Sequence, residues 1–175
     1  MLFNSLSFAV FLVIVLALYY SKLFNWTNKK RMLLFASYVF YGLWNPPLVI
    51  LLWISTVVDW TAGKRLAVED NQRKRKFWLL LSMCVNLGFL AFFKYGDFLL
   101  ENFVSLVNSF GIDYKVRPMD IILPMGISFY TFHGLSYVID IYYKRIKAES
   151  NFIDYSLFVS YFPLLVAGPI ERATH

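Results

Sequence analysis

The sequence predicts an all-α fold, that of a polytopic integral membrane protein with broken or re-entrant helices. Of its 175 residues, 59% are hydrophobic and 16% are charged, whereas soluble domains usually carry about a quarter charged residues. The apolar residues also form long uncharged runs, and roughly 20 helical residues cross a hydrocarbon core. This composition excludes disordered, fibrous and disulfide-framework proteins. The uncharged runs cover residues 2–21, 32–58, 77–93, 121–139 and 155–170.

The net charge of +6 does not indicate nucleic-acid binding. The 17 basic residues cluster at the ends of the apolar runs, where lipid headgroups and membrane topology account for them. We therefore expect the lipid bilayer, and no nucleic acid, as a partner. The single cysteine, Cys84, lies within an apolar run, so no intrachain disulfide is possible.

The first two apolar runs differ in continuity. Run 2–21 ends in Tyr19, Tyr20 and Lys22, an aromatic belt followed by a lysine that can reach the headgroups, and it is long enough to span once. Run 32–58 is interrupted at Asn45-Pro46-Pro47, because proline removes a backbone donor and disfavours helix in the residue before it. Two interpretations remain: one long kinked span, or two arms of 11 to 13 residues that enter and leave by the same face.

The distribution of basic residues favours the returning arms. Basic loops are expected at 22–31 and 64–76, and a third cluster follows at Lys144, Arg145 and Lys147. If the broken segment returns, all three lie in the cytoplasm, as the positive-inside tendency favours, and they hold 13 of the 17 basic residues. We therefore expect an extracytoplasmic N-terminus.

Two more helices are expected in the following segment. Residues 98–110 carry one polar stripe opposite an apolar face, a pattern that predicts an interfacial amphipathic helix on the outer side, ended by Gly111. After a polar connection at 113–120, Pro124 suits the first turn of a membrane helix that continues to Tyr143. The stripe consists of Glu101, Asn102, Ser105, Asn108 and Ser109.

The helix from Pro124 to Tyr143 is the most polar of the membrane helices. Tyr130, His133, Ser136, Tyr137 and Asp140 recur at three- and four-residue spacing, so they share one face. Because lipid cannot satisfy such a face, it should point into a bundle or a polar cavity. This polar face either lines a tunnel or forms hydrogen bonds with neighbouring helices. For His133 we favour the structural role, because no paired nucleophile or second ligand accompanies it.

Metal and cofactor motifs are absent from the sequence. His133 and His175 are the two histidines, and neither has a second ligand at the usual spacing, so we expect no metal site. The last apolar run is interrupted at Pro163 and closes on Gly168, Pro169, Glu171 and Arg172. Irregular backbone at membrane depth lies buried in protein or faces water, so this ending suggests the rim of a cavity.

Several stretches together resemble the membrane-bound O-acyltransferase family, particularly its bacterial branch of alginate O-acetyltransferase and teichoic-acid D-alanyl-transfer proteins. Their order and spacing across nearly the whole chain make the joint match specific. The matching stretches are Ala36 to Tyr41 before a tryptophan, Phe92-Phe93-Lys94-Tyr95, Leu123 to Phe132, Ser136 to Asp140 with Tyr142, and Phe162-Pro163 followed by Ala167 to Arg172.

The resemblance implies a fold of tilted and broken helices around a tunnel, in a bacterial inner membrane. It implies transfer of an acyl group, expected to be acetyl, to a hydroxyl of an exported polysaccharide or cell-envelope acceptor. The expected donor is a cytoplasmic thioester, either acetyl-CoA or an acyl-carrier thioester. No bound cofactor is expected. The family histidine lies in a later segment, beyond His175, so no catalytic residue is assigned here, and Tyr130, His133, Ser136, Tyr137, Asp140, Gly168, Pro169, Glu171 and Arg172 are expected to line or shape the tunnel.

By this resemblance, residues 1–175 form a single membrane domain that corresponds to the N-terminal third of a longer chain, inactive alone. Its partners would be the later helices of that chain and an extracytoplasmic acetyltransferase- or esterase-like protein. Two alternatives stay open: a transporter- or channel-like protein, for which an intramembrane Asp140 is also natural, and a structural membrane subunit without chemistry.

Overall fold

The structure is a computed structural model that describes residues 5–22, 24–111, 114, 123–124 and 126–167. Within these residues the secondary structure is helical throughout, with no β-strand, so the predicted all-α fold is confirmed. The elements are α1 (Leu6–Tyr20), α2 (Trp26–Gly42), the 3-10 turn η1 (Pro46–Leu48), α3 (Val49–Val68), α4 (Gln72–Ser109), α5 (Ile127–Tyr142), α6 (Phe152–Ser160) and α7 (Phe162–Ala167).

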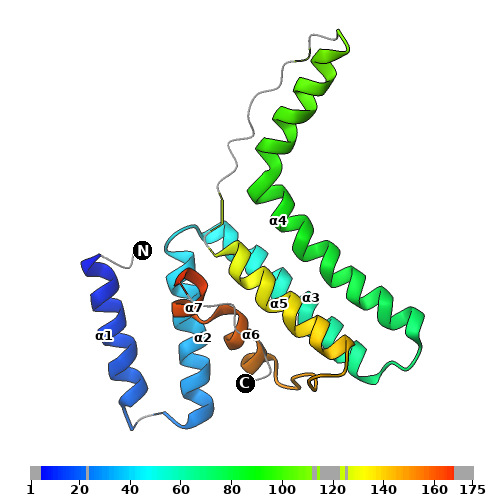
Figure 1. Ribbon diagram of the computed structural model, residues 1–175. Coiled ribbons are helices and arrows are strands. Elements are labelled where there is room, and N and C mark those ends of the chain that lie inside the picture. Colours follow the sequence, from blue (N-terminus) through cyan, green and yellow to red (C-terminus); the bar gives the residue numbers. More distant parts are fainter. Residues whose placement is uncertain (1–4, 23, 112–113, 115–122, 125, 168–175) are drawn as a thin grey trace.

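The helices form two groups that share a core. In one group α3, α4 and α5 pack side by side, and in the other α1 and α2 lie next to the short helices α6 and α7 (Figure 1). Helix α4 runs on past the bundle, so its second half projects away from the other helices (Figure 1).

The interruption predicted at Asn45-Pro46-Pro47 is confirmed. Helix α2 ends at Gly42, η1 covers Pro46–Leu48, and α3 then runs back in the opposite direction (Figure 1). One long kinked span is therefore wrong. The expected arm lengths are wrong too, because both helices continue into the basic segments: α2 has 17 residues and α3 has 20.

The separate helix expected at 98–110 is not found. Helix α4 is continuous over 38 residues from Gln72 to Ser109. Gly96 is the one strong helix breaker between the apolar run and the polar stripe, and a single glycine costs only about 1 kcal/mol within a helix. Gly111, with a φ of +83°, ends the helix as expected. Most of the polar and apolar residues of the projecting half are exposed.

Helix α5 begins later than expected. It starts at Ile127, because Gly126 adopts a left-handed conformation with a φ of +73°, which helical residues do not share. Pro124 therefore precedes the helix instead of occupying its first turn. The predicted break at Pro163 is confirmed: α6 ends at Ser160, and α7 begins at Phe162. The backbone N–H of Phe162 donates to the hydroxyl of Ser37 on α2, at 3.1 Å.

Two helical segments of the described chain are long and apolar enough to cross a membrane. They are Pro46–Val68, with 23 residues, and Gln72–Ser109, with 38 residues. Helix α1 has 15 residues, fewer than the roughly 20 that a span needs, so the described part of run 2–21 is shorter than expected.

The core has a mixed part and an aromatic part. In the mixed part Leu52 and Leu66 of α3 and Val138 of α5 are fully buried. In the aromatic part Phe11 of α1 meets Phe162 of α7 edge-on, with ring centroids 5.4 Å apart. In lipid such contacts act through van der Waals packing, and here they join α1 to the rest of the bundle.

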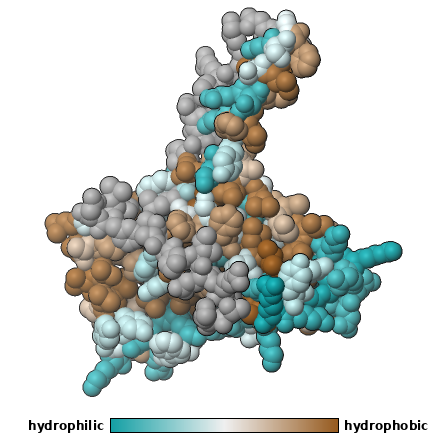
Figure 2. Space-filling view, in the orientation of Figure 1, coloured by the Kyte–Doolittle hydropathy of each residue, from teal (hydrophilic) through white to brown (hydrophobic). Residues whose placement is uncertain are grey.

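The basic clusters gather at one end of the molecule. The α1–α2 connection, the α3–α4 connection and the end of α5 lie on the same lower side in Figure 1, and hydrophilic residues follow that edge in Figure 2. The expected basic loops are largely helical, because Asn25 and Asn71 start α2 and α4 ahead of their lysines and arginines.

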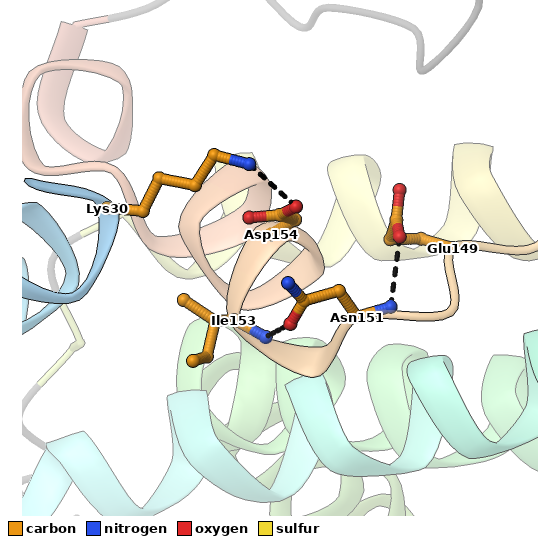
Figure 3. A network of polar contacts seen from close by, with 5 residues as sticks. All are labelled: Lys30, Glu149, Asn151, Ile153 and Asp154. Atoms are coloured by element: carbon orange, nitrogen blue, oxygen red, sulfur yellow. Dashed lines mark hydrogen bonds and ion pairs between the residues drawn. The ribbon is translucent and has the colours of Figure 1, made fainter. Parts of the chain in front are cut away.

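The start of α6 is tied to this basic end. Lys30 of α2 forms an ion pair with Asp154 of α6, at 2.8 Å (Figure 3). Asn151 caps α6 by accepting a hydrogen bond from the N–H of Ile153 at 3.0 Å, and its own N–H donates to Glu149 at 2.9 Å (Figure 3). These contacts fix where the chain enters α6.

Candidate functional site

The polar face predicted on α5 is directed into the bundle. Tyr130, His133, Tyr137 and Asp140 are buried, and Ser136 is half-buried. Helix α5 packs against α3 and α4 on its sides and against α6 and α7. The five residues therefore lie on one helix, but they face different neighbouring helices.

The lower part of this face makes local contacts. The hydroxyl of Ser136 donates to the carbonyl oxygen of His133 at 2.9 Å, and Asp140 forms an ion pair with Arg145 at 3.2 Å. The hydroxyl of Tyr137 accepts a hydrogen bond from the N–H of Glu149 at 2.9 Å. These contacts hold the end of α5 against the segment that leads into α6.

The upper part of the face lies among aromatic rings. The ring of His133 lies 5.6 Å from that of Phe158 on α6, and the hydroxyl of Tyr130 lies beside that of Tyr41 on α2. Lining of a tunnel by these residues stays a prediction. The other predicted residues, Gly168, Pro169, Glu171 and Arg172, lie outside the described residues, as does His175.

A second polar cluster, which was not predicted from the sequence, joins two helices, α3 and α4, at the centre of the bundle. Asp59 of α3 is fully buried and accepts hydrogen bonds from the hydroxyl of Ser82 at 2.6 Å and from the amide of Asn86 at 2.7 Å. The hydroxyl of Ser55 donates to the amide oxygen of Asn86 at 2.5 Å. We call these four residues the Asp59 cluster.

Two glycines allow α5 to approach this cluster. A Cβ added to Gly134 of α5 would overlap the Asp59 carboxylate, and one added to Gly63 of α3 would lie 2.7 Å from the Tyr137 ring. Small residues let helix backbones pack closely where polar groups meet. The second oxygen of Asp59 therefore lies against the backbone of α5, where it has no hydrogen-bond partner among the described residues.

The spacing of the Asp59 cluster could have revealed it. Ser55 and Asp59 are four residues apart on α3, and Ser82 and Asn86 are four residues apart on α4. Each pair therefore occupies one face of its helix. Asp59 follows directly after the uncharged run 32–58, so the position of its carboxylate at the end of that run did not predict its burial.

The arrangement can orient helices and hold a proton or a charge in the interior. A buried carboxylate is stable only when hydrogen bonds replace the water it loses. The described residues contain no cluster of three or more His, Cys, Asp or Glu that could hold a metal ion.

The fold and the site together define a class: an all-α protein whose long apolar helices enclose buried polar side chains and carry their basic residues at one end. No family model and no solved structure matches the chain. Known proteins do match it. It is 40% identical over 174 residues to the probable alginate O-acetylase AlgI of Pseudomonas aeruginosa, and 38% identical to that of Azotobacter vinelandii, with 98% of this chain covered in each case.

A third relative is named for a different polymer. The peptidoglycan O-acetyltransferase of Helicobacter pylori is 32% identical over 165 residues, which cover 81% of this chain. The matches cover 33%, 34% and 30% of the three relatives, so the chain spans about a third of their length. The chain belongs to the family of these O-acetyltransferases, the membrane-bound O-acyltransferase type that its motifs resemble.

Proposed function

We propose that this chain is part of a membrane-bound O-acetyltransferase that modifies a cell-envelope polysaccharide. The acetyl group would come from a cytoplasmic thioester, either acetyl-CoA or an acyl-carrier thioester, and would pass to a hydroxyl of the exported polymer. The observation that carries this proposal is 40% identity to a probable alginate O-acetylase over nearly the whole chain.

In this proposal the described helices supply the frame of the enzyme. Acetyl transfer to a hydroxyl needs a base that takes the hydroxyl proton, and such a base contributes about 10² to 10⁴ in rate. His133 is buried beside Phe158 on a helix whose polar groups make structural contacts, so we assign it a structural role. The base is expected outside the described residues.

The proposed topology has the basic end in the cytoplasm of a bacterial inner membrane and the N-terminus outside. The gathering of the basic clusters at one end supports it. Single cysteines in a Cys84→Ser background test it. Cysteines replacing Lys22, Lys74 and Lys147 should react only with cytoplasmic reagent, and one replacing Ser109 only with external reagent; a mixed pattern among the three lysine positions would contradict the topology.

Acetyl transfer is tested in the source bacterium with the full-length protein. Deleting the gene should remove ester-linked acetate from one exported polymer, and the wild-type gene should restore it. Measuring acetate separately on secreted polysaccharide and on peptidoglycan identifies the acceptor. Membranes supplied with labelled acetyl-CoA test the donor. Unchanged acetate on both polymers would contradict the proposal and favour a transport or structural role.

The proposed partner is an extracytoplasmic acetyltransferase- or esterase-like protein that completes transfer to the polymer. Affinity purification of the tagged full-length protein from crosslinked cells should recover such a protein. Recovery of the enzyme with no extracytoplasmic partner, from cells that acetylate the polymer normally, would show that the enzyme acts without one.

A further inference from the structure

A cavity of about 600 Å³ lies at the basic end of the bundle, between the end of α3, the start of α4 and the segment after α5. Four of its lining residues are basic and none is acidic. Its size suits a small ligand or a lipid headgroup. The basic lining residues are Arg75, Lys144, Arg145 and Lys147.

Arg75 gives the cavity a fixed, buried positive charge. Arg75 is 5% exposed. Its guanidinium donates hydrogen bonds to four carbonyl oxygens: those of Leu66 and Glu69 at the end of α3, and those of Ile141 and, at 2.7 Å, Tyr142 at the end of α5. These carbonyls belong to the C-terminal ends of two helices, which carry partial negative charge. No carboxylate among the described residues pairs with Arg75, so its full charge is only partly compensated.

The rim of the cavity carries two unpaired ammonium groups. Lys144 and Lys147 are exposed, and no described side chain forms an ion pair or hydrogen bond with either ammonium. Arg145 is the exception, because it pairs with Asp140 at 3.2 Å. The cavity therefore keeps an excess of positive charge after its internal contacts are counted.

The backbone at Lys144 adds an independent observation. Its φ is +58°, a left-handed conformation that glycine adopts most readily and that costs other residues about 1 kcal/mol or more. The N–H of Arg145 donates to the carbonyl oxygen of Asp140 at 2.8 Å, as in a common helix C-cap with glycine at this position. A lysine here places an ammonium at the rim where glycine would be more stable.

Apolar surface adjoins the cavity. Leu66, Ile141 and Ile146 form part of its wall, and Val68 and Phe77, on the flanking ends of α3 and α4, are 78% and 60% exposed. A ligand that fits such a site has an anionic group and an apolar portion. Guanidinium and ammonium donors bind phosphate oxygens by charge-assisted hydrogen bonds.

We propose that this cavity binds the phosphate ester of an anionic phospholipid headgroup, held between Arg75 below and Lys144 and Lys147 at the rim. The acyl chains would lie along the exposed apolar ends of α3 and α4. The proposal does not depend on the proposed function, because its test needs no acetyl transfer.

The test uses the full-length protein in a neutral detergent, titrated with phosphatidylglycerol that carries a fluorescent acyl chain. Phosphatidylcholine provides the zwitterionic comparison, and inorganic phosphate provides the soluble source of the same group. Phosphatidylglycerol should saturate near one lipid per chain and bind at least tenfold more tightly than phosphatidylcholine.

Two double variants separate the cavity from the general positive charge of this end. Lys144→Gly with Lys147→Gln removes the rim charges while favouring the left-handed backbone, and it should weaken binding about tenfold or more without loss of thermal stability. Arg73→Gln with Lys76→Gln removes two exposed charges of α4 that do not line the cavity, and it should weaken binding less than threefold.

Each outcome decides the proposal. Binding of inorganic phosphate with the same dependence on the rim lysines, and no binding of lipid, would overturn the phospholipid proposal and show that the cavity binds a soluble phosphate. Equal weakening by both double variants, or saturable binding of neither ligand, would overturn the proposal.

Discussion

Gly134 is the position at which the packing of α5 on the Asp59 cluster is most sensitive to a single methyl group. A Cβ there would overlap the carboxylate of Asp59 and lie 3.0 Å from its carboxyl carbon. Gly88 of α4 is a matched control, because a Cβ added to it meets nothing within 4 Å. Both glycines lie inside helices, so Gly→Ala brings the same gain in helix propensity at each.

The magnitude follows from three contributions. Replacing a helical glycine by alanine stabilises a helix by about 1 kcal/mol. Forcing an extra carbon into a packed interior costs about 1–3 kcal/mol. If the carboxylate of Asp59 moves away, its bonds to Ser82 and Asn86 are lost at about 1 kcal/mol each. Gly134→Ala should therefore destabilise by about 2–4 kcal/mol, and Gly88→Ala should stabilise by up to about 1 kcal/mol.

The assay is thermal unfolding of the full-length protein in detergent, followed by tryptophan fluorescence. Gly134→Ala should lower Tm by several degrees, and Gly88→Ala should leave it unchanged or raise it. In an Asp59→Ala background the penalty of Gly134→Ala should disappear, because the overlapping group is gone. Equal shifts for the two glycine variants, or a penalty at Gly134 that persists in that background, would refute the reasoning.

Three further perturbations have defined outcomes. Arg75→Ala should lower stability by about 2–4 kcal/mol, because buried carbonyl groups lose a charged donor, while Arg73→Ala, which is exposed, should change it by less than about 0.5 kcal/mol; chemical unfolding in detergent measures both. Gly126→Ala combines a left-handed φ with overlap of the Leu165 carbonyl, so it should cost more than about 2 kcal/mol, and wild-type stability would contradict this contact. His133→Ala should keep most acetyl transfer to the polymer, and a thousandfold loss would show a catalytic role.

The sequence predicted the helical breaks because their causes are local. Proline at 46–47 and at 163 removes a donor and restricts the preceding residue whatever surrounds it, and the structure breaks the helices at those places. The predicted start of α5 was too early, because glycine tolerates both helical and left-handed backbone and the sequence does not show which one Gly126 adopts. In the structure Gly126 is left-handed and lies against the carbonyl of Leu165, which is far along the chain.

The length of α4 was also not predictable from its polar pattern. A change from an apolar run to a polar stripe shows where the surroundings of a helix change, and it does not end the helix unless a breaker is present. Gly96 is buried within α4 and leaves it continuous. Whether the second half of α4 lies along a membrane interface or projects from the bundle depends on what surrounds it. The polar pattern of its own residues does not contain that information.

By itself the sequence determined the helical class, the proline breaks and the clustering of basic residues, because each follows from composition or from local chemistry. The resemblance to membrane-bound O-acyltransferases was also visible in the sequence, in the order and spacing of its motifs. Only the tertiary structure brought Asp59 of α3 to Ser82 and Asn86 of α4, and Arg75 to the ends of α3 and α5. Those contacts join residues far apart in the chain, so they depend on how the helices cross. Helix crossing is decided by the fit of side chains such as those around Gly63 and Gly134.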